Sequence, residues 1–189
     1  MSEATKHCEY CALSARHFPS LIANYNNNDN TTFARRRSNP TSSAECTAEQ
    51  AYEWSNGTCV FASGSPFDPV ERDGKTYYPT QCNNMFIFPG LGLGATLCGS
   101  KHVTDRMLYQ SAVALASFLT EEELAEGKVF PRVSDIRSVS HDVACAVIKE
   151  AWDAGLTSRI TDKEMDNLEE WVTAKMYNPV YVPLTERWG

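Results

Sequence analysis

The most constraining feature of the sequence is a helix pattern that runs straight into a buried-strand pattern. The helix pattern opens with a capping box, Ser42-x-x-Glu45, and good helix formers continue over residues 44–54. Asn56-Gly57 ends this helix, because both residues tolerate the left-handed conformation found after a helix. The apolar run at residues 59–62 follows and predicts a short buried strand. Since a helix followed by a buried strand is half of a parallel repeat, we predict an α/β fold.

Candidate ligand-binding residues stand where the predicted elements end. Pro40 fixes its own φ angle and moves Asn39 out of the helical region, so one element ends at Asn39. Ser63 and Gly64 follow directly after the predicted strand. In open α/β sheets, ligands bind outside the carboxyl ends of the strands. We therefore expect Asn39, Ser63 and Gly64 to lie near a bound ligand.

Turn and helix signals divide the rest of the chain. Asp73-Gly74 between apolar residues predicts a β-hairpin, and we prefer this turn interpretation of Asp73 to metal ligation. Ser134 is the predicted cap of a long helix, and His141 on that helix is interpreted as structural. Helix patterns cover residues 104–119, 120–127, 134–154 and a last helix that starts at residue 161. Capping boxes open the second and the last of these.

The glycine-rich segment Gly90-Leu91-Gly92-Leu93-Gly94-Ala95 formally matches a dinucleotide-binding fingerprint. We reject that interpretation, because the fingerprint must follow a strand and open a βαβ unit. Here the glycines interrupt a helix-like apolar segment over residues 86–98. Small residues at this spacing predict a helix that packs closely on a neighbouring element.

Composition and charge exclude several classes of protein. The 189 residues are 42% hydrophobic and 22% charged, which suits one globular domain with a core. The net charge of −7 argues against binding to nucleic acid, and no apolar run approaches the ~20 residues of a membrane span. The seven cysteines are an odd number, so we expect free thiols in a reducing compartment. No apolar leader follows Met1, so we do not expect secretion. We expect a cytoplasmic location and leave mitochondrion and plastid open.

Three motifs resemble the carboxyl-terminal part of the malic enzymes: SNPTSSAECTAEQAY from Ser38, CVFASGSPFDPV from Cys59 and QCNNMFIFPGLGLG from Gln81. The resemblance implies the carboxyl-terminal half of a Rossmann-like NAD(P)-binding domain over residues 38–157, with a helical carboxyl-terminal extension over residues 158–189. Residues 1–37 are Asn-rich and end in an arginine cluster, so we expect a weakly structured segment outside the family pattern.

The resemblance also implies roles for individual residues. Malic enzymes oxidatively decarboxylate malate to pyruvate with NAD or NADP and a divalent metal, Mg²⁺ or Mn²⁺. Their counterparts of Asn39, and of Asn83 or Asn84, offer amide groups to malate. A carboxamide suits this task, because it presents two donors and one acceptor without adding charge. The implied substrate-binding residues are Asn39, Asn83 and Asn84, and the implied cofactor-binding residues are Asn39, Ser63 and Gly64.

The same resemblance implies what these 189 residues do not supply. In the family, the catalytic Tyr and Lys, the metal-binding carboxylates and the GxGxxG loop come from the amino-terminal side of the SNPT turn, and residues 1–37 hold no counterpart. We therefore expect neither catalytic residues nor metal ligands here, and no activity from this chain alone. Two hypotheses remain: a malic enzyme piece completed by other chain, or a non-catalytic module that docks on a full-length homologue. In either case we expect a homo-oligomer or an assembly with a homologous chain.

Overall fold

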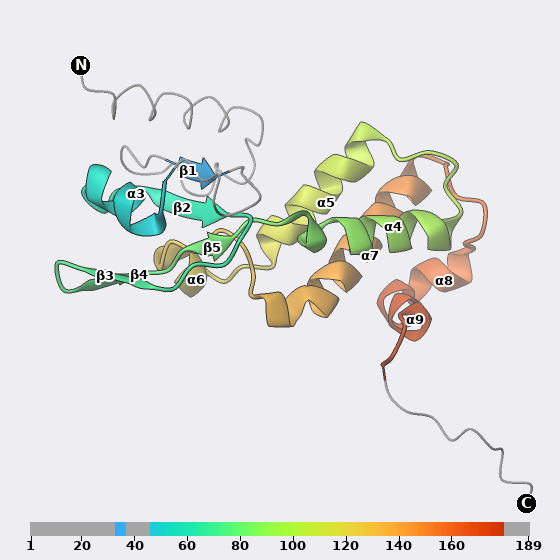
Figure 1. Ribbon diagram of the computed structural model, residues 1–189. Coiled ribbons are helices and arrows are strands. Elements are labelled where there is room, and N and C mark those ends of the chain that lie inside the picture. The colour runs from blue at the N-terminus through green and yellow to red at the C-terminus, as the bar shows by residue number, and fades with distance from the viewer. Residues whose placement is uncertain (1–32, 37–45, 180–189) are drawn as a thin grey trace, which may run out of the picture.

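The computed structural model describes residues 33–36 and 46–179, which form a small α/β part joined to a larger helical part (Figure 1). Residues 1–32, most of the segment for which we expect weak structure, lie outside the described residues, as does Asn39. Helix α4 leads directly from the edge of the sheet into the helical part. The position of the sheet edge is therefore tied to the packing of that helix.

The α/β part contains a three-stranded parallel sheet in the order β1-β2-β5. The strands are β1 (Phe33–Arg36), β2 (Val60–Ser63) and β5 (Thr80–Gln81), and α3 (Ala48–Trp54) lies in the connection from β1 to β2. The α/β prediction is confirmed. Strand β1, however, falls within residues 1–37, for which the sequence predicts weak structure, so that expectation is wrong for residues 33–36. The strand is four residues long and includes two arginines, and such a segment carries no buried-strand pattern.

Helix α3 begins at Ala48, later than the predicted start at residue 44. Thr47 Oγ1 accepts a hydrogen bond from the Gln50 amide at 3.3 Å, and Gln50 Oε1 accepts one from the Thr47 amide at 2.9 Å. Thr47-x-x-Gln50 is thus the capping box that the helix uses. The helix buries Tyr52 against Phe61 of β2, with ring centroids 6.2 Å apart, and so covers one face of the sheet.

The predicted hairpin is confirmed as β3 (Val70–Arg72) and β4 (Lys75–Tyr77), which pair antiparallel. Asp73 and Gly74 have φ angles of 52° and 75°, as a two-residue hairpin turn requires. Arg72 Nη1 donates to the Tyr52 carbonyl at 3.0 Å, so the hairpin is attached to the last turn of α3.

The helical part follows the predicted order with two corrections. Ser134 does not cap the long helix: it lies in a short 3-10 helix, η4 (Val133–Asp135), and α7 begins after it. The predicted last helix is divided in two at Asn167. The helices are α4 (Phe88–Cys98), α5 (Asp105–Ser117), α6 (Glu121–Ala125), α7 (Ile136–Asp153), α8 (Asp162–Asp166) and α9 (Leu168–Lys175).

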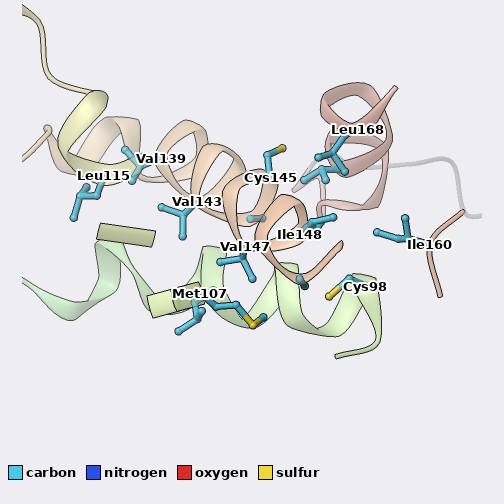
Figure 2. Close-up of a cluster of buried hydrophobic side chains, with 14 of the residues drawn as sticks. Cys98, Met107, Leu115, Val139, Val143, Cys145, Val147, Ile148, Ile160 and Leu168 are labelled. Carbon is cyan, nitrogen blue, oxygen red and sulfur yellow. The ribbon is translucent and has the colours of Figure 1, made fainter. Parts of the chain in front are cut away.

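The main hydrophobic core lies around α7, and Figure 2 shows Val143 and Val147 directed from α7 toward α4. Close contact between these two helices depends on glycine. A Cβ atom at Gly90 would lie 2.6 Å from both the Ser140 carbonyl oxygen and the Val143 Cβ atom. A Cβ atom at Gly94 would lie 2.8 Å from the Ala144 carbonyl oxygen. The predicted close packing of the glycine-rich segment is confirmed.

His141 connects α7 to α9. Its Nδ1 atom lies 2.9 Å from an Asp142 carboxylate oxygen, and its Nε2 atom lies 3.0 Å from the Glu169 carbonyl oxygen. Both partners are acceptors, so the protonated imidazole can donate to both of them. Partial burial lowers the pKa of His141, but the hydrogen bonds to Asp142 and Glu169 outweigh this effect and raise the pKa above its ordinary value. The structural interpretation of this histidine agrees with these contacts.

The glycine contacts predict opposite effects for neighbouring glycine-to-alanine substitutions in α4. Gly90→Ala and Gly94→Ala should each lower the free energy of unfolding by about 1–3 kcal/mol, because α4 must move away from α7. Gly92 is the matched control, since nothing lies within 4 Å of its added Cβ atom. Gly92→Ala should raise the free energy of unfolding by roughly 0.5–1 kcal/mol through helix propensity. Urea unfolding of the three variants measures this, and equal effects at all three sites would contradict the packing described.

The His141 contacts predict that stability falls as pH rises. The folded-state pKa is raised above 6.5, so the contribution is fully present below pH 6.5 and is lost as pH rises through the folded-state value. Urea unfolding between about pH 5.5 and pH 8.5 should show this decrease, and His141→Gln should reduce it. His102→Gln, at an exposed histidine, serves as the control. An unchanged pH dependence in His141→Gln would show that this imidazolium does not hold α9.

Candidate functional site

The carboxyl ends of β2 and β5 lie side by side and bring together four of the five predicted site residues. β2 ends at Ser63, and Gly64 follows it. β5 pairs with β2 through Ala62–Thr80 and Ser63–Gln81, and Asn83 and Asn84 come shortly after β5. The Cys82 amide donates to the Ser63 carbonyl at 2.7 Å, which extends the pairing toward the two asparagines. The fifth residue, Asn39, lies beyond the carboxyl end of β1 in the sequence and outside the described residues.

The Gly64 carbonyl is the centre of the polar contacts at this edge. It accepts a hydrogen bond from Gln81 Nε2 at 3.2 Å and another from Asn83 Nδ2 at 3.3 Å. Asn83 Oδ1 also accepts from the Met85 amide at 3.1 Å and caps the 3-10 helix η3 (Asn84–Phe86). The Asn83 side chain therefore connects the segment after β2 to the start of the helical part.

Asn84 differs from Asn83 in both exposure and bonding. Asn84 is exposed, whereas Asn83 is half-buried. The Asn84 carboxamide makes no hydrogen bond within the part of the chain that the structure describes. Its two donors and one acceptor are thus available to a ligand at the carboxyl edge of the sheet. Of the two adjacent asparagines, the geometry favours Asn84 as the one that meets a ligand.

Ser63 and Gly64 present backbone atoms to this edge. Ser63 is only 2% exposed, and its Oγ accepts from the Ser65 amide at 3.4 Å, so its side chain shapes the turn. Gly64 is half-buried, and its carbonyl is already bonded to two side-chain amides. Contact between this segment and a ligand would therefore use the remaining backbone atoms rather than the serine hydroxyl.

Gln81 also lies at this edge, although it was not among the predicted site residues. It is half-buried, and its contact with Gly64 joins positions 17 residues apart. A period-two pattern was the available signal, because residues two apart on an extended segment point to the same side. Gln81 and Asn83 are two apart, and both amides meet the same carbonyl.

The glycine-rich segment does not form a phosphate-binding loop. Residues 90–95 lie within α4, where Gly90, Leu91 and Gly94 are buried. A dinucleotide loop instead exposes backbone amides between a strand and the first turn of a helix. The rejection of the fingerprint is confirmed, and the described residues contain no match to it at a strand end.

Among the described residues, metal-binding and nucleophilic groups are not gathered at this edge. Within residues 46–179, no group of three or more His, Cys, Asp and Glu side chains could hold a metal ion. Burial raises the pKa of the Cys145 thiol to about 11 and also raises the pKa of Cys98, which is opposite to the activation of a nucleophile. None of the helices in the described ranges is long and apolar enough to cross a membrane.

Comparison with known proteins agrees with the resemblance seen in the motifs. The family model described as "Malic enzyme, NAD binding domain" matches residues 26–152. This match begins before the predicted boundary at residue 38 and includes β1. The crystal structure of Entamoeba histolytica malic enzyme is similar in fold, with a TM-score of 0.54 and 22% identity over 76% of this chain and 26% of that one.

Two relatives show closer similarity in sequence. An NADP-dependent malic enzyme from Dictyostelium discoideum is 51% identical over 144 residues, which cover 76% of this chain and 26% of that protein. NADP-dependent malic enzyme 2 from Arabidopsis thaliana is 50% identical over 144 residues, which cover 76% of this chain and 24% of that protein. The chain thus spans about a quarter of the length of these relatives.

The contrast between the two asparagines predicts different effects on stability. Asn83→Ala removes the cap of η3 and one donor to Gly64, so it should lower the free energy of unfolding by about 1–3 kcal/mol. Asn84→Ala removes no such contact and should change it by less than about 0.5 kcal/mol. Urea unfolding of both variants measures the difference, and comparable losses would mean that Asn84 has a structural partner.

Proposed function

The chain belongs to the malic enzyme family, and on this premise we propose that it supplies part of the NAD(P)-binding domain of an enzyme that converts malate to pyruvate and CO₂. The reaction is an oxidative decarboxylation with NAD or NADP. The observation that carries the proposal is the exposed carboxamide of Asn84, which has no hydrogen bond within residues 33–36 and 46–179 and stands shortly after β5, beside the carboxyl end of β2.

The proposed role of Asn84 is to orient malate. Malate carries two carboxylates, and an amide donor can bind one of them without adding a charge that would hold the product. The position of Asn84 supports this role, because it follows directly on Asn83, the residue that caps η3 at the sheet edge. Asn39 follows β1 in the sequence, and we propose that Asn39, Ser63 and Gly64 contact the cofactor at the same edge.

The remaining chemistry needs groups that the described residues do not provide. A divalent metal, Mg²⁺ or Mn²⁺, stabilises the charge that develops on the ketone oxygen during such a decarboxylation. The described carboxylates do not form a ligand set for it, and the glycine-rich segment within α4 does not fit the cofactor phosphates. We propose that a further polypeptide segment supplies the base, the acid, the metal ligands and the phosphate loop.

The proposed partner is therefore malic enzyme polypeptide, as an additional segment or as a homologous chain in an oligomer. The alternative function is a non-catalytic module that docks on a full-length homologue. Exposed apolar side chains on α5 favour some protein contact, with Leu108 at 45% and Tyr109 at 53% exposure. The cytoplasmic location, with mitochondrion and plastid left open, stays a prediction.

The 189-residue chain alone should not oxidise malate. Purified protein with malate, Mn²⁺ and either NAD or NADP should give no increase in reduced-cofactor absorbance, because the cofactor has no phosphate anchor in the described residues. The control is a complete relative assayed under the same conditions. Steady turnover that co-purifies with this chain would falsify the need for a further segment.

A chimera tests the role of Asn84. Residues 26–152 replace the matching segment of the Dictyostelium discoideum relative, and the chimera is assayed with malate and NADP. Asn84→Ala should lower kcat/KM for malate roughly ten- to hundredfold, since a hydrogen bond to a charged group is worth about 1.5–3 kcal/mol. Thr58→Ala, at an exposed residue away from the sheet edge, is the control. Unchanged kinetics in Asn84→Ala would remove this residue from the substrate site.

A further inference from the structure

Two side-chain amides meet at one backbone carbonyl at the edge of the sheet. Gln81 Nε2 and Asn83 Nδ2 lie 3.2 Å and 3.3 Å from the Gly64 carbonyl oxygen. A carbonyl oxygen has two lone pairs, so these two donors satisfy it completely. The Gly64 carbonyl is consequently not available to a ligand, and both amides serve to hold it.

Each of the two amides connects Gly64 to a different structural unit. Gln81 is the last residue of β5, so its contact adds to the pairing of β5 with β2. Asn83 caps η3, which precedes α4. The segment after β2 is therefore joined to the sheet by one amide and to the start of the helical part by the other.

Asn84 depends on this arrangement for its position. It follows Asn83 directly and is the first residue of η3. Its own carboxamide has no partner in the described part of the chain, so none of the described side chains holds its tip in place. The backbone of Asn83 and Asn84 must provide the orientation. The backbone bond from Cys82 to Ser63 and the contact between Asn83 and Gly64 both hold this backbone beside the end of β2.

We propose that Gln81 and Asn83 are positioning residues, which hold the Gly64 carbonyl so that the Asn84 carboxamide is oriented toward malate. This inference rests on the proposed function, because it assigns the positioning to that substrate. Gln81 acts through Asn84 and does not touch malate itself.

A double-mutant cycle in the chimera tests the positioning. Gln81→Met keeps the length of the side chain, adds no charge and removes the donor to Gly64. It should lower kcat/KM for malate about tenfold when Asn84 is present, and less than twofold in the Asn84→Ala background. A direct contact between Gln81 and malate would instead give the same decrease in both backgrounds. That result, or no decrease in either background, would overturn the proposal.

Two further variants separate the cap from the positioning contact. Asn83→Ser retains a good helix-capping side chain but is too short to reach Gly64, so it should show the same dependence on Asn84 as Gln81→Met. Gln110→Met on α5 makes the same chemical exchange away from the sheet edge and should leave kcat/KM unchanged. A decrease in the Gln110 variant equal to that of Gln81→Met would also overturn the proposal.

Amide hydrogen exchange on the 189-residue chain provides a measurement that does not depend on activity. Gln81→Met should speed exchange of the Met85 amide, which donates to Asn83, by about fivefold or more, while amides in the middle of α7 remain unchanged. Unchanged exchange at Met85 would contradict the contact network itself. If the chimera without substitutions does not turn over malate but Met85 responds, the proposed function fails and the positioning for malate fails with it, whereas the hydrogen-bond network stands.

Discussion

The close contact of α4 with α7 determines where the rest of the structure can lie. Gly90 and Gly94 let the α4 backbone approach Ser140, Val143, Ala144 and Val147 to distances that a Cβ atom would not allow. The main hydrophobic core forms around this contact. Because α4 begins only a few residues after Asn83 and Asn84, the same contact also fixes the distance from the core to the sheet edge. The geometry at the candidate site therefore depends on how the helical part packs.

Asn83 and Asn84 are adjacent at the sheet edge but differ in their hydrogen bonds and exposure. Asn83 uses both ends of its carboxamide within the protein, as a cap and as a donor to Gly64. Asn84 is exposed and has no such contact in the described ranges. An internal hydrogen bond and a ligand contact compete for the same donor, so a residue that is bonded internally is less suited to bind a substrate. An exposed amide beside the carboxyl ends of parallel strands is well placed to contact a ligand.

Local signals in the sequence predicted much of the fold but not its long-range contacts. Thr120 starts a helix as its capping box indicates, and Asp73-Gly74 forms the hairpin, because these signals act within four residues. Strand β1 was not predicted, because its pairing with β2 is made by backbone atoms and its sequence carries no apolar pattern. The roles of Gln81 and Asn83 depend on a carbonyl 17 and 19 residues away, which no local pattern specifies. The start of α3 differs from the prediction because Thr47-x-x-Gln50 forms a capping box there.

A crystal structure of the chimera with bound malate would show whether Asn84 binds the substrate. We expect an Asn84 amide nitrogen about 2.7–3.2 Å from a malate carboxylate oxygen. We also expect Gln81 and Asn83 to donate to the Gly64 carbonyl in that complex. Malate bound away from the carboxyl ends of β2 and β5, or held there by Asn83 with Asn84 directed to solvent, would contradict these roles.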